Sequence, residues 1–279
     1  MPRTKTRREE PEPKKENPYL PKACKVTLFK RESPDCFLIR ADWKGKYEPG
    51  QFFQVSIPGI GEAPISVASY SEDHLDMNIR EVGNVTKYLA NLKKGDTIYI
   101  RGPYGNGYPM EKFYGKNLLL IGGGSGVAPL KGILMYVDKH NDNFSDVTLY
   151  FGFRTPDDIL FKDDLKNWRK KFQCNVSVDK NPKHVKTACD VCFVTSLVEK
   201  AKLDPENKVV FICGPPIMMK ICVGLLKNKG FTEDQIYIST ERLMNCALGL
   251  CGHCMIHGKY TCLDGPVFRL DELSEFKHD

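Results

Sequence analysis

Asn117-Leu-Leu-Leu-Ile-Gly-Gly-Gly-Ser-Gly-Val-Ala-Pro129 is the stretch that decides the fold of the C-terminal half of the chain. Its apolar run predicts a buried strand, and the glycines predict a tight turn into a helix whose first turn carries Pro129. Such a turn presents backbone N–H groups and a helix N-terminus to an anion, the geometry that cradles a dinucleotide pyrophosphate. Because the glycine pattern ends at Pro129 rather than at a third glycine, a plain strand-to-helix turn stays open as the alternative.

Strands and helices alternate downstream of this turn. We expect helices at 129–140, 161–171, 196–202 and 216–229, and strands at 147–153, 174–178 and 208–213. This alternation predicts a parallel sheet covered by helices on both faces. A second turn, Cys213-Gly-Pro-Pro216, follows a strand and leads into a helix, so two turns suited to a ligand would lie at strand ends of one sheet.

Short antiparallel strands are expected upstream. Alternating segments at 25–29, 36–40, 52–57 and 76–80 are separated by Gly and Pro turns, which predicts a small antiparallel β-barrel with a brief helix at 85–92. The first residues are mostly charged or proline and predict disorder. We therefore expect a disordered tail, a barrel domain, an α/β domain and a cysteine-bearing segment, with the boundaries 1–17, 18–112, 113–240 and 241–279.

Four cysteines crowd the last of these segments, with the spacing Cys246-x4-Cys251-x2-Cys254-x7-Cys262. The first three share the x4, x2 spacing with which plant-type ferredoxins hold a [2Fe–2S] cluster. Each of the two irons needs two protein sulfurs, and the glycines of the loop permit the bending that reaches both. A structural zinc site stays the alternative, although only Cys251 and Cys254 have the pair spacing typical of zinc. We interpret His253 and His257 as solvated neighbours of the ligands.

Composition excludes several function classes. Eleven cysteines are many for 279 residues, but their odd number and the absence of a signal peptide argue against a secreted disulfide scaffold and favour a cytoplasmic protein. The net charge of +6 is spread among mixed acidic and basic residues, so neither a nucleic acid nor a membrane is an expected partner. Outside the C-terminal loop, Cys189-x2-Cys192 is interpreted as part of a turn, and the core is expected to hold Cys24, Cys36, Cys174 and Cys222.

Together these motifs resemble the ferredoxin–NADP reductase superfamily from about residue 17 onward. The cysteine loop is similar to that of the branch that holds the electron-transfer subunits of dihydroorotate dehydrogenase, sulfhydrogenase and anaerobic sulfite reductase. Within this branch the resemblance is closest to the anaerobic sulfite reductase proteins, and sulfhydrogenase gamma subunits share most of the motifs that carry it. These motifs are 61–66, 101–107, 214–218, 251–254 and 264–268.

The resemblance implies FAD on the barrel. The family's Arg-x-Tyr-Ser motif maps on Ala63-Pro-Ile-Ser66, where the arginine is missing, and we expect Arg80 to supply the positive charge instead. A solvated charge at Arg80, and ordinary turn or N-cap chemistry at Ser66 and Thr86, are the alternatives. The implied flavin contacts are Pro64, Ile65, Ser66, Ile79, Arg80, Gly83, Val85 and Thr86.

A nicotinamide nucleotide is implied on the α/β domain. Asp157 and Asp158 would repel a second phosphate and so favour NADH over NADPH, whereas Glu241 is interpreted as a solvent-exposed carboxylate. No catalytic acid, base or nucleophile is expected, because the cofactors carry the chemistry. The implied contacts are Gly123, Gly124, Ser125 and Gly126 at the pyrophosphate, Gly152 and Arg154 near the adenosine, and Cys213, Gly214, Pro215 and Pro216 beside the nicotinamide.

The resemblance therefore implies a subunit that moves electrons from NAD(P)H through FAD and a [2Fe–2S] cluster to a partner. The expected partners are an iron–sulfur subunit and a sirohaem sulfite reductase subunit. One alternative is the gamma subunit of a nickel–iron sulfhydrogenase, with hydrogenase subunits as partners. A zinc-stabilised binding module without flavin is the other, motivated by the arginine missing at Ala63.

Overall fold

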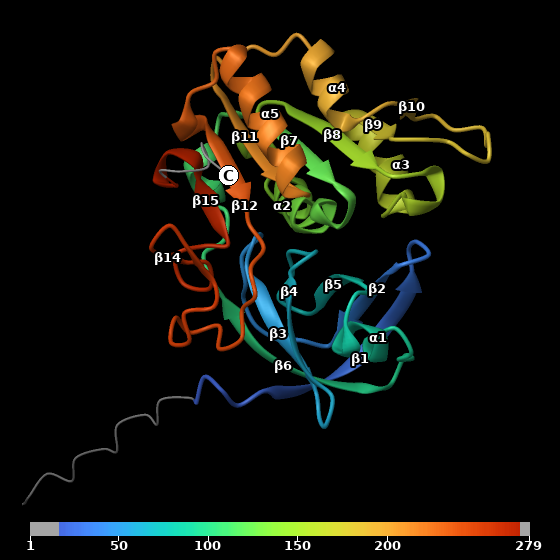
Figure 1. Ribbon diagram of the computed structural model, residues 1–279, viewed down its shortest axis with the longest axis vertical. Coiled ribbons are helices and arrows are strands. Elements are labelled where there is room, and N and C mark those ends of the chain that lie inside the picture. The colour runs from blue at the N-terminus through green and yellow to red at the C-terminus, as the bar shows by residue number, and fades with distance from the viewer. Residues whose placement is uncertain (1–16, 274–279) are drawn as a thin grey trace, which may run out of the picture.

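The computed structural model describes residues 17–273, and the predicted N-terminal tail lies, up to residue 16, outside the described residues. A β-domain and an α/β domain stack end to end, and the cysteine loop lies along the side of the β-domain (Figure 1). Within 17–273, no helix combines the length and the apolar character needed to cross a membrane.

The β-domain is a six-stranded antiparallel sheet with the order β4-β3-β6-β1-β2-β5. An isolated bridge between Val67 and Met77 joins its two edges, so the sheet closes into the predicted barrel. Phe37, Phe53 and Ile100 are fully buried in its core. The strands are β1 (Lys22–Arg31), β2 (Cys36–Ala41), β3 (Phe52–Ile57), β4 (Gly61–Ser66), β5 (Leu75–Arg80) and β6 (Thr97–Tyr104), and helix α1 (Asn84–Leu89) follows β5.

The α/β domain has a seven-stranded sheet with the order β10-β9-β8-β7-β11-β12-β15. Every pair is parallel except β12 with β15. Its strands are β7 (Asn117–Gly123), β8 (Val147–Phe153), β9 (Gln173–Val178), β10 (Asp190–Val191), β11 (Lys208–Cys213), β12 (Ile236–Ser239) and β15 (Val267–Arg269). Between the two domains and within this one, short 3-10 turns occupy Met110–Phe113, Gly124–Gly126, Asn141–Asn143, Pro156–Asp158, Glu233–Gln235 and Leu270–Glu272.

Helices cover both faces of this sheet, as the alternation of elements predicts. On one face Leu130 and Leu165 pack with Leu118 and Leu120 of β7, and on the other Val198 and Leu226 pack with the intervening β7 residues. Because β7 is buried on both faces, its apolar run is continuous rather than alternating. The helices are α2 (Val127–Lys139) and α3 (Lys162–Lys171) on the first face, and α4 (Val194–Lys200) and α5 (Pro216–Asn228) on the second.

The cysteine segment is tied back into the sheet. After a small hairpin of β13 (Met255–Ile256) and β14 (Lys259–Tyr260), the chain returns as β15 and pairs antiparallel with β12. The sequence did not predict β15, because a three-residue strand gives too little alternation to be recognised locally.

A polar seam joins the two domains. Glu32, whose side chain is only 3% exposed, accepts a hydrogen bond of 2.9 Å from the N–H of Phe161. Phe161 precedes α3 and has the left-handed φ of 53°, an uncommon conformation for a residue with a large side chain. Lys30 bridges the seam as well, at 3.0 Å from Glu32 and 3.0 Å from Asp163.

Replacing Glu32 by alanine should lower the free energy of unfolding by about 1–3 kcal/mol, because the buried N–H of Phe161 loses its acceptor. Chemical denaturation measures the change. Asp73→Ala is the matched control, since Asp73 pairs with Lys44 in full solvent exposure and its removal should leave the midpoint unchanged. Equal effects of the two substitutions would contradict the importance of the seam.

Candidate functional site

The four cysteines of the C-terminal loop lie as two pairs. The Sγ atoms of Cys254 and Cys262 are 3.3 Å apart, and both residues are buried. The thiol of Cys251 hydrogen-bonds to the side chain of Cys246, and Cys251 is exposed. The loop therefore has a buried pair on the side of the barrel and a second pair on the side of the solvent.

Backbone N–H groups point at these sulfurs. Leu248 and Leu250 donate to Cys246 Sγ at 3.4 and 3.3 Å, and Gly249 donates to Cys262 Sγ at 3.2 Å. At Gly249 a side chain is excluded, because its φ is 69° and a Cβ would lie 2.2 Å from Leu263. The loop is thus shaped to direct donors at sulfur, which stabilises negative charge on a metal–thiolate centre.

The surroundings of the two pairs differ electrostatically. Backbone hydrogen bonding at His253, together with the Cys246 side chain, lowers the pKa of Cys251 to about 7. Burial raises the pKa of Cys262 to about 12, and its contact with Cys254 adds to the shift. Without a metal, Cys262 therefore holds its proton, and metal binding must displace it.

The donor set fits a binuclear cluster better than a single metal ion. Among residues 17–273, no three His, Cys, Asp or Glu side chains converge closely enough to hold one ion. A tetrahedral zinc ion needs four donors around one point. A [2Fe–2S] cluster instead needs two sulfurs at each of two irons, and two thiol pairs meet that requirement.

Arg101, on β6, holds the loop against the barrel. Its guanidinium donates to the carbonyl oxygens of Cys246 (2.9 Å) and Asn245 (3.2 Å) and pairs with Glu62 of β4 at 2.5 Å. Burial alone would raise the pKa of Glu62, but the hydrogen bonds from Arg101 outweigh it and the net shift is downward. Arg101 and Glu62 are far apart in the chain and come together only through strand pairing, so local sequence motifs do not predict their contact.

Apolar contacts complete the docking of the loop. Phe52 of β3 packs in one cluster with Met244, Ala247, Cys254 and Cys262. Figure 1 shows the loop beside β3 and β6. The buried cysteine pair is therefore covered by the outer face of the barrel.

The two predicted nucleotide turns lie side by side in the sheet. The strand order reverses between β7 and β11, and such a switch point opens a crevice at the carboxyl ends of the strands. Gly122 pairs with Cys213 across these strands. A Cβ on Gly126 would lie 2.5 Å from the carbonyl oxygen of Cys213, and one on Gly123 would lie 2.4 Å from Met218 Sδ. The glycines at these positions are required by this contact between the turns.

Cys213 ends β11, at the carboxyl edge of the sheet beside Gly122 of β7. Burial raises the pKa of its thiol to about 12, and the negative charge of Glu241 contributes to the shift. Glu241 is exposed, as expected from the sequence, and its charge acts on Cys213.

Arg80 and Arg154 meet at one carboxylate. Arg80 Nε lies 3.1 Å and Arg154 Nη2 lies 2.9 Å from Asp35 Oδ2, and Arg154 also pairs with Asp158 at 2.8 Å. These arginines come from different domains, so the residues predicted for the flavin and for the adenosine converge at the seam. Gly152 has a packing role, because a Cβ there would lie 2.7 Å from Val194.

The predicted flavin motif on β4 is split between the two faces of the sheet. Ile65 points into the barrel core, whereas Pro64 and Ser66 alternate to the outer face. Ile79 of β5 is a core residue too. These two isoleucines can therefore reach a flavin only through their backbone.

The segment before α1 uses Thr86 for its own turn. The hydroxyl of Thr86 accepts hydrogen bonds from the N–H groups of Val82 (3.0 Å) and Gly83 (2.9 Å), in a capping-box arrangement. Thr86, the third residue of α1, thus takes part in the turn before the helix, and its contact with a flavin stays a prediction. Val85 packs on the barrel core and lies 3.2 Å from the position of a Cβ on Gly61.

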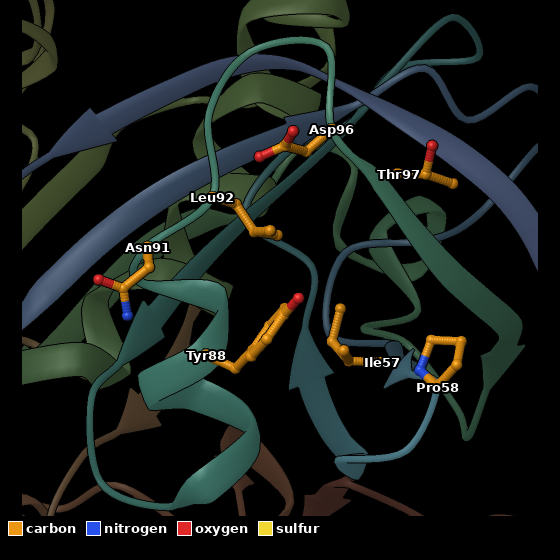
Figure 2. A pocket seen from close by; sticks show the side chains of 7 residues that line it. All are labelled: Ile57, Pro58, Tyr88, Asn91, Leu92, Asp96 and Thr97. Atoms are coloured by element: carbon orange, nitrogen blue, oxygen red, sulfur yellow. The ribbon is translucent and has the colours of Figure 1, made fainter.

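A surface pocket of about 470 Å³ lies on the barrel beside Ile57, the last residue of β3 (Figure 2). It opens where the turn after β3 meets the end of α1, at the opposite end of β3 from Phe52. It contains none of the predicted site residues. The lining residues are Ile57, Pro58, Tyr88, Asn91, Leu92, Asp96 and Thr97.

Comparison with known proteins places these features in a family. Residues 120–224 match the oxidoreductase NAD-binding domain, and residues 241–274 match the iron–sulfur cluster binding domain of dihydroorotate dehydrogenase B. The gamma subunit of sulfhydrogenase 2 from Pyrococcus furiosus is 40% identical over 242 residues, which cover 80% of this chain and 83% of that protein. A probable dihydroorotate dehydrogenase B electron transfer subunit of Methanocaldococcus jannaschii is 30% identical, with 91% of each chain covered.

A solved structure has the same fold. The NADH-dependent reduced ferredoxin–NADP oxidoreductase, described for flavin-based electron bifurcation, contains a chain with a TM-score of 0.73 and 27% identity. The match covers 90% of this chain and 91% of that one. It spans both domains, so the likeness is to the whole arrangement rather than to the nucleotide-binding sheet alone.

Gly126→Ala should force the two turns apart, because the new Cβ would meet backbone atoms of Cys213 and Gly214 at 2.5 and 2.6 Å. We expect loss of nucleotide binding, measured by calorimetry with NAD⁺, and a lower melting temperature. Gly224→Ala, in the middle of α5 with open space around it, is the control and should raise stability by up to about 1 kcal/mol. Unchanged nucleotide affinity in Gly126→Ala would show that the turns do not form the binding site.

Proposed function

Since this chain belongs to the ferredoxin–NADP reductase superfamily, in the family of sulfhydrogenase gamma subunits and dihydroorotate dehydrogenase electron-transfer subunits, we propose that it carries electrons from NADH through FAD and a [2Fe–2S] cluster to a partner subunit. One observation carries the proposal. Four cysteines form two pairs, and the buried pair, Cys254 and Cys262, packs against the barrel face that bears Pro64 and Ser66.

When bound, NADH supplies a hydride, FAD takes up both electrons and releases them singly, and a [2Fe–2S] cluster passes them on one at a time. The protein supplies binding and orientation. The turn from Gly123 to Gly126 offers backbone N–H groups and the start of α2 to the pyrophosphate. Pro64 and Ser66 offer a surface for the flavin ring. The N–H groups of Leu248, Gly249 and Leu250 stabilise thiolate charge and so favour the reduced form of a bound cluster.

Electrons would leave on the solvent side of the loop. The Cys246–Cys251 pair faces outward, while the other pair is covered by Phe52. Large apolar side chains are exposed in the same segment, and such exposure marks a surface that another protein covers. These side chains are Leu243, Leu250, Met255 and Leu263.

The relatives favour a hydrogenase as the partner. Sulfhydrogenase gamma subunits match this chain at 40% and 36% identity, and this supports the hydrogenase alternative over the sulfite reductase partner that the sequence analysis put first. We therefore propose hydrogenase-type subunits as the partners that exchange electrons with the loop. Affinity purification from the native cell tests this: co-purified hydrogenase subunits support it, and co-purified sulfite reductase subunits contradict it.

NADH preference is supported by acidic groups near Arg154. Asp179 follows β9, and burial raises its pKa while the charge of Asp158 adds to the shift. An adenosine 2′-phosphate near Arg154 would meet the carboxylate of Asp179, whereas Asp158 is already paired with Arg154. Asp157 contributes less than the sequence analysis assumed, because Lys183 pairs with it at 2.5 Å.

Anaerobically purified protein should be yellow-brown and contain FAD with equal amounts of iron and acid-labile sulfide. Adding NADH should bleach the visible bands and produce the electron paramagnetic resonance signal of a reduced cluster. A colourless protein containing zinc would refute the electron-transfer function and support the zinc-stabilised module.

Asp179→Ser should raise kcat/KM for NADPH relative to NADH by about tenfold, because a carboxylate that repels the second phosphate is removed. Steady-state reduction of an artificial electron acceptor by each nucleotide measures the ratio. Asp157→Ser is the matched control and should change the ratio little, since Lys183 already neutralises Asp157. The same change in both variants would contradict a specific effect of Asp179.

A further inference from the structure

Gln54 is a buried amide that the motifs did not single out. It lies in the middle of β3 and is 1% exposed. Its Nε2 donates to the carbonyl oxygen of Met244, two residues before Cys246 in the chain. Its Oε1 is also buried and, among the described residues, has no hydrogen-bond partner.

The orientation of this amide is fixed by its neighbour. Exchanging Nε2 and Oε1 would set two carbonyl oxygens against each other at Met244, so Oε1 must point away from the loop. Arg101 is the residue opposite Gln54 on β6, and its donors are directed at other groups. Those groups are Glu62, Tyr104, Asn245 and Cys246.

On the other side of Gln54 lies β4, where the residue opposite is Pro64. Residues opposite each other in an antiparallel pair share one face of the sheet, so Gln54 and Pro64 both lie on the outer face. Phe52 and Ser66 form the next such pair. The unpartnered oxygen is therefore next to the strand that carries the predicted flavin motif.

A buried acceptor without a donor is rare in folded proteins, because the group loses its water without compensation. Pro64 has no N–H to offer. A donor on a bound molecule that lies against β4 would satisfy this oxygen. The oxidised flavin ring carries one such group, the N–H of its pyrimidine portion.

We propose that Gln54 Oε1 accepts a hydrogen bond from the ring N–H of bound flavin. The same amide then holds the flavin with its oxygen and, through Met244, the segment that leads into Cys246 with its nitrogen. This inference rests on the proposed function, since it takes FAD as the ligand. Gln54 is in this sense a positioning residue that fixes the ring relative to the cysteine loop.

The test compares two variants of the holoprotein. Gln54→Met removes the acceptor with little change in volume, and Gln54→Glu keeps an oxygen acceptor but loses the donor to Met244. The dissociation constant of FAD, from flavin fluorescence, should rise about tenfold in Gln54→Met, as expected for the loss of one hydrogen bond. The resonance Raman band that contains the ring N–H bend, identified by its shift in D₂O, should move in Gln54→Met, which removes the acceptor. It should move in the opposite direction in Gln54→Glu, because a carboxylate oxygen is a stronger acceptor.

Gln51→Leu is the control, because both polar atoms of the Gln51 side chain have hydrogen-bond partners within the protein. Nε2 donates to the Gly105 carbonyl at 2.9 Å, and Oε1 accepts from the Glu48 N–H at 2.8 Å. It should leave the Raman band unchanged. An unmoved band and wild-type affinity in Gln54→Met would overturn the inference, as would an equal band shift in Gln51→Leu. If Gln54→Met does not fold, Gln54→Ser replaces it with the same expected outcome. If the wild-type protein binds no FAD, the proposed function itself is overturned. This outcome separates a failure of the proposed function from a failure of the inference on Gln54.

Discussion

The hydrogen bonds from Arg101 to the cysteine loop are the interaction on which the rest of the site depends. The loop has no core of its own, and only a two-stranded hairpin gives it regular structure. A buried guanidinium stabilises such a segment only if every donor finds an acceptor. Here one carboxylate, one hydroxyl and two loop carbonyls take the donors, so the first ligand segment is fixed to β6.

Because Arg101 holds the cysteine loop at β6, the loop and the predicted flavin motif on β4 would be neighbours on one sheet. Arg101, Gln54 and Pro64 form a row across β6, β3 and β4, and adjacent strands are about 4.8 Å apart. A cofactor on the β4 end of that row and a metal centre on the β6 end would lie close together without any moving part. The seam ties the α/β domain to the same barrel, because Arg80 and Arg154 share one carboxylate, that of Asp35. The proposed function would use three binding sites of this arrangement in series.

Local patterns in the sequence predicted what depends on local structure. The apolar run of β7 marks a buried strand wherever it occurs, and β8 and β11 were predicted with the same bounds that the structure has. Cysteine spacing predicted the ligand set. It did not predict that Cys254 pairs with Cys262 and Cys246 with Cys251, because pairing depends on how the glycines fold the loop. The assignment of the site residues to cofactors stays a prediction from the sequence.

Long-range pairing explains what was missed. Glu62 and Arg101 are far apart in the chain and meet only because β3 lies between their strands. The partner of Arg80 is likewise invisible locally, since Asp35 stands before β2 and approaches only when β2 pairs with β5. Gln54 shows the same limit, as an isolated glutamine in an alternating strand predicts an exposed side chain rather than a buried one.

The most direct test of this account is reduction of the cluster by NADH in the same protein with and without FAD. Flavin is removed anaerobically, and the cluster signal is followed by stopped-flow absorbance and electron paramagnetic resonance. If the three sites act in series, the flavin-free protein keeps its cluster oxidised in the presence of NADH, and added FAD restores rapid reduction. Equally fast reduction of the cluster without flavin would contradict the account.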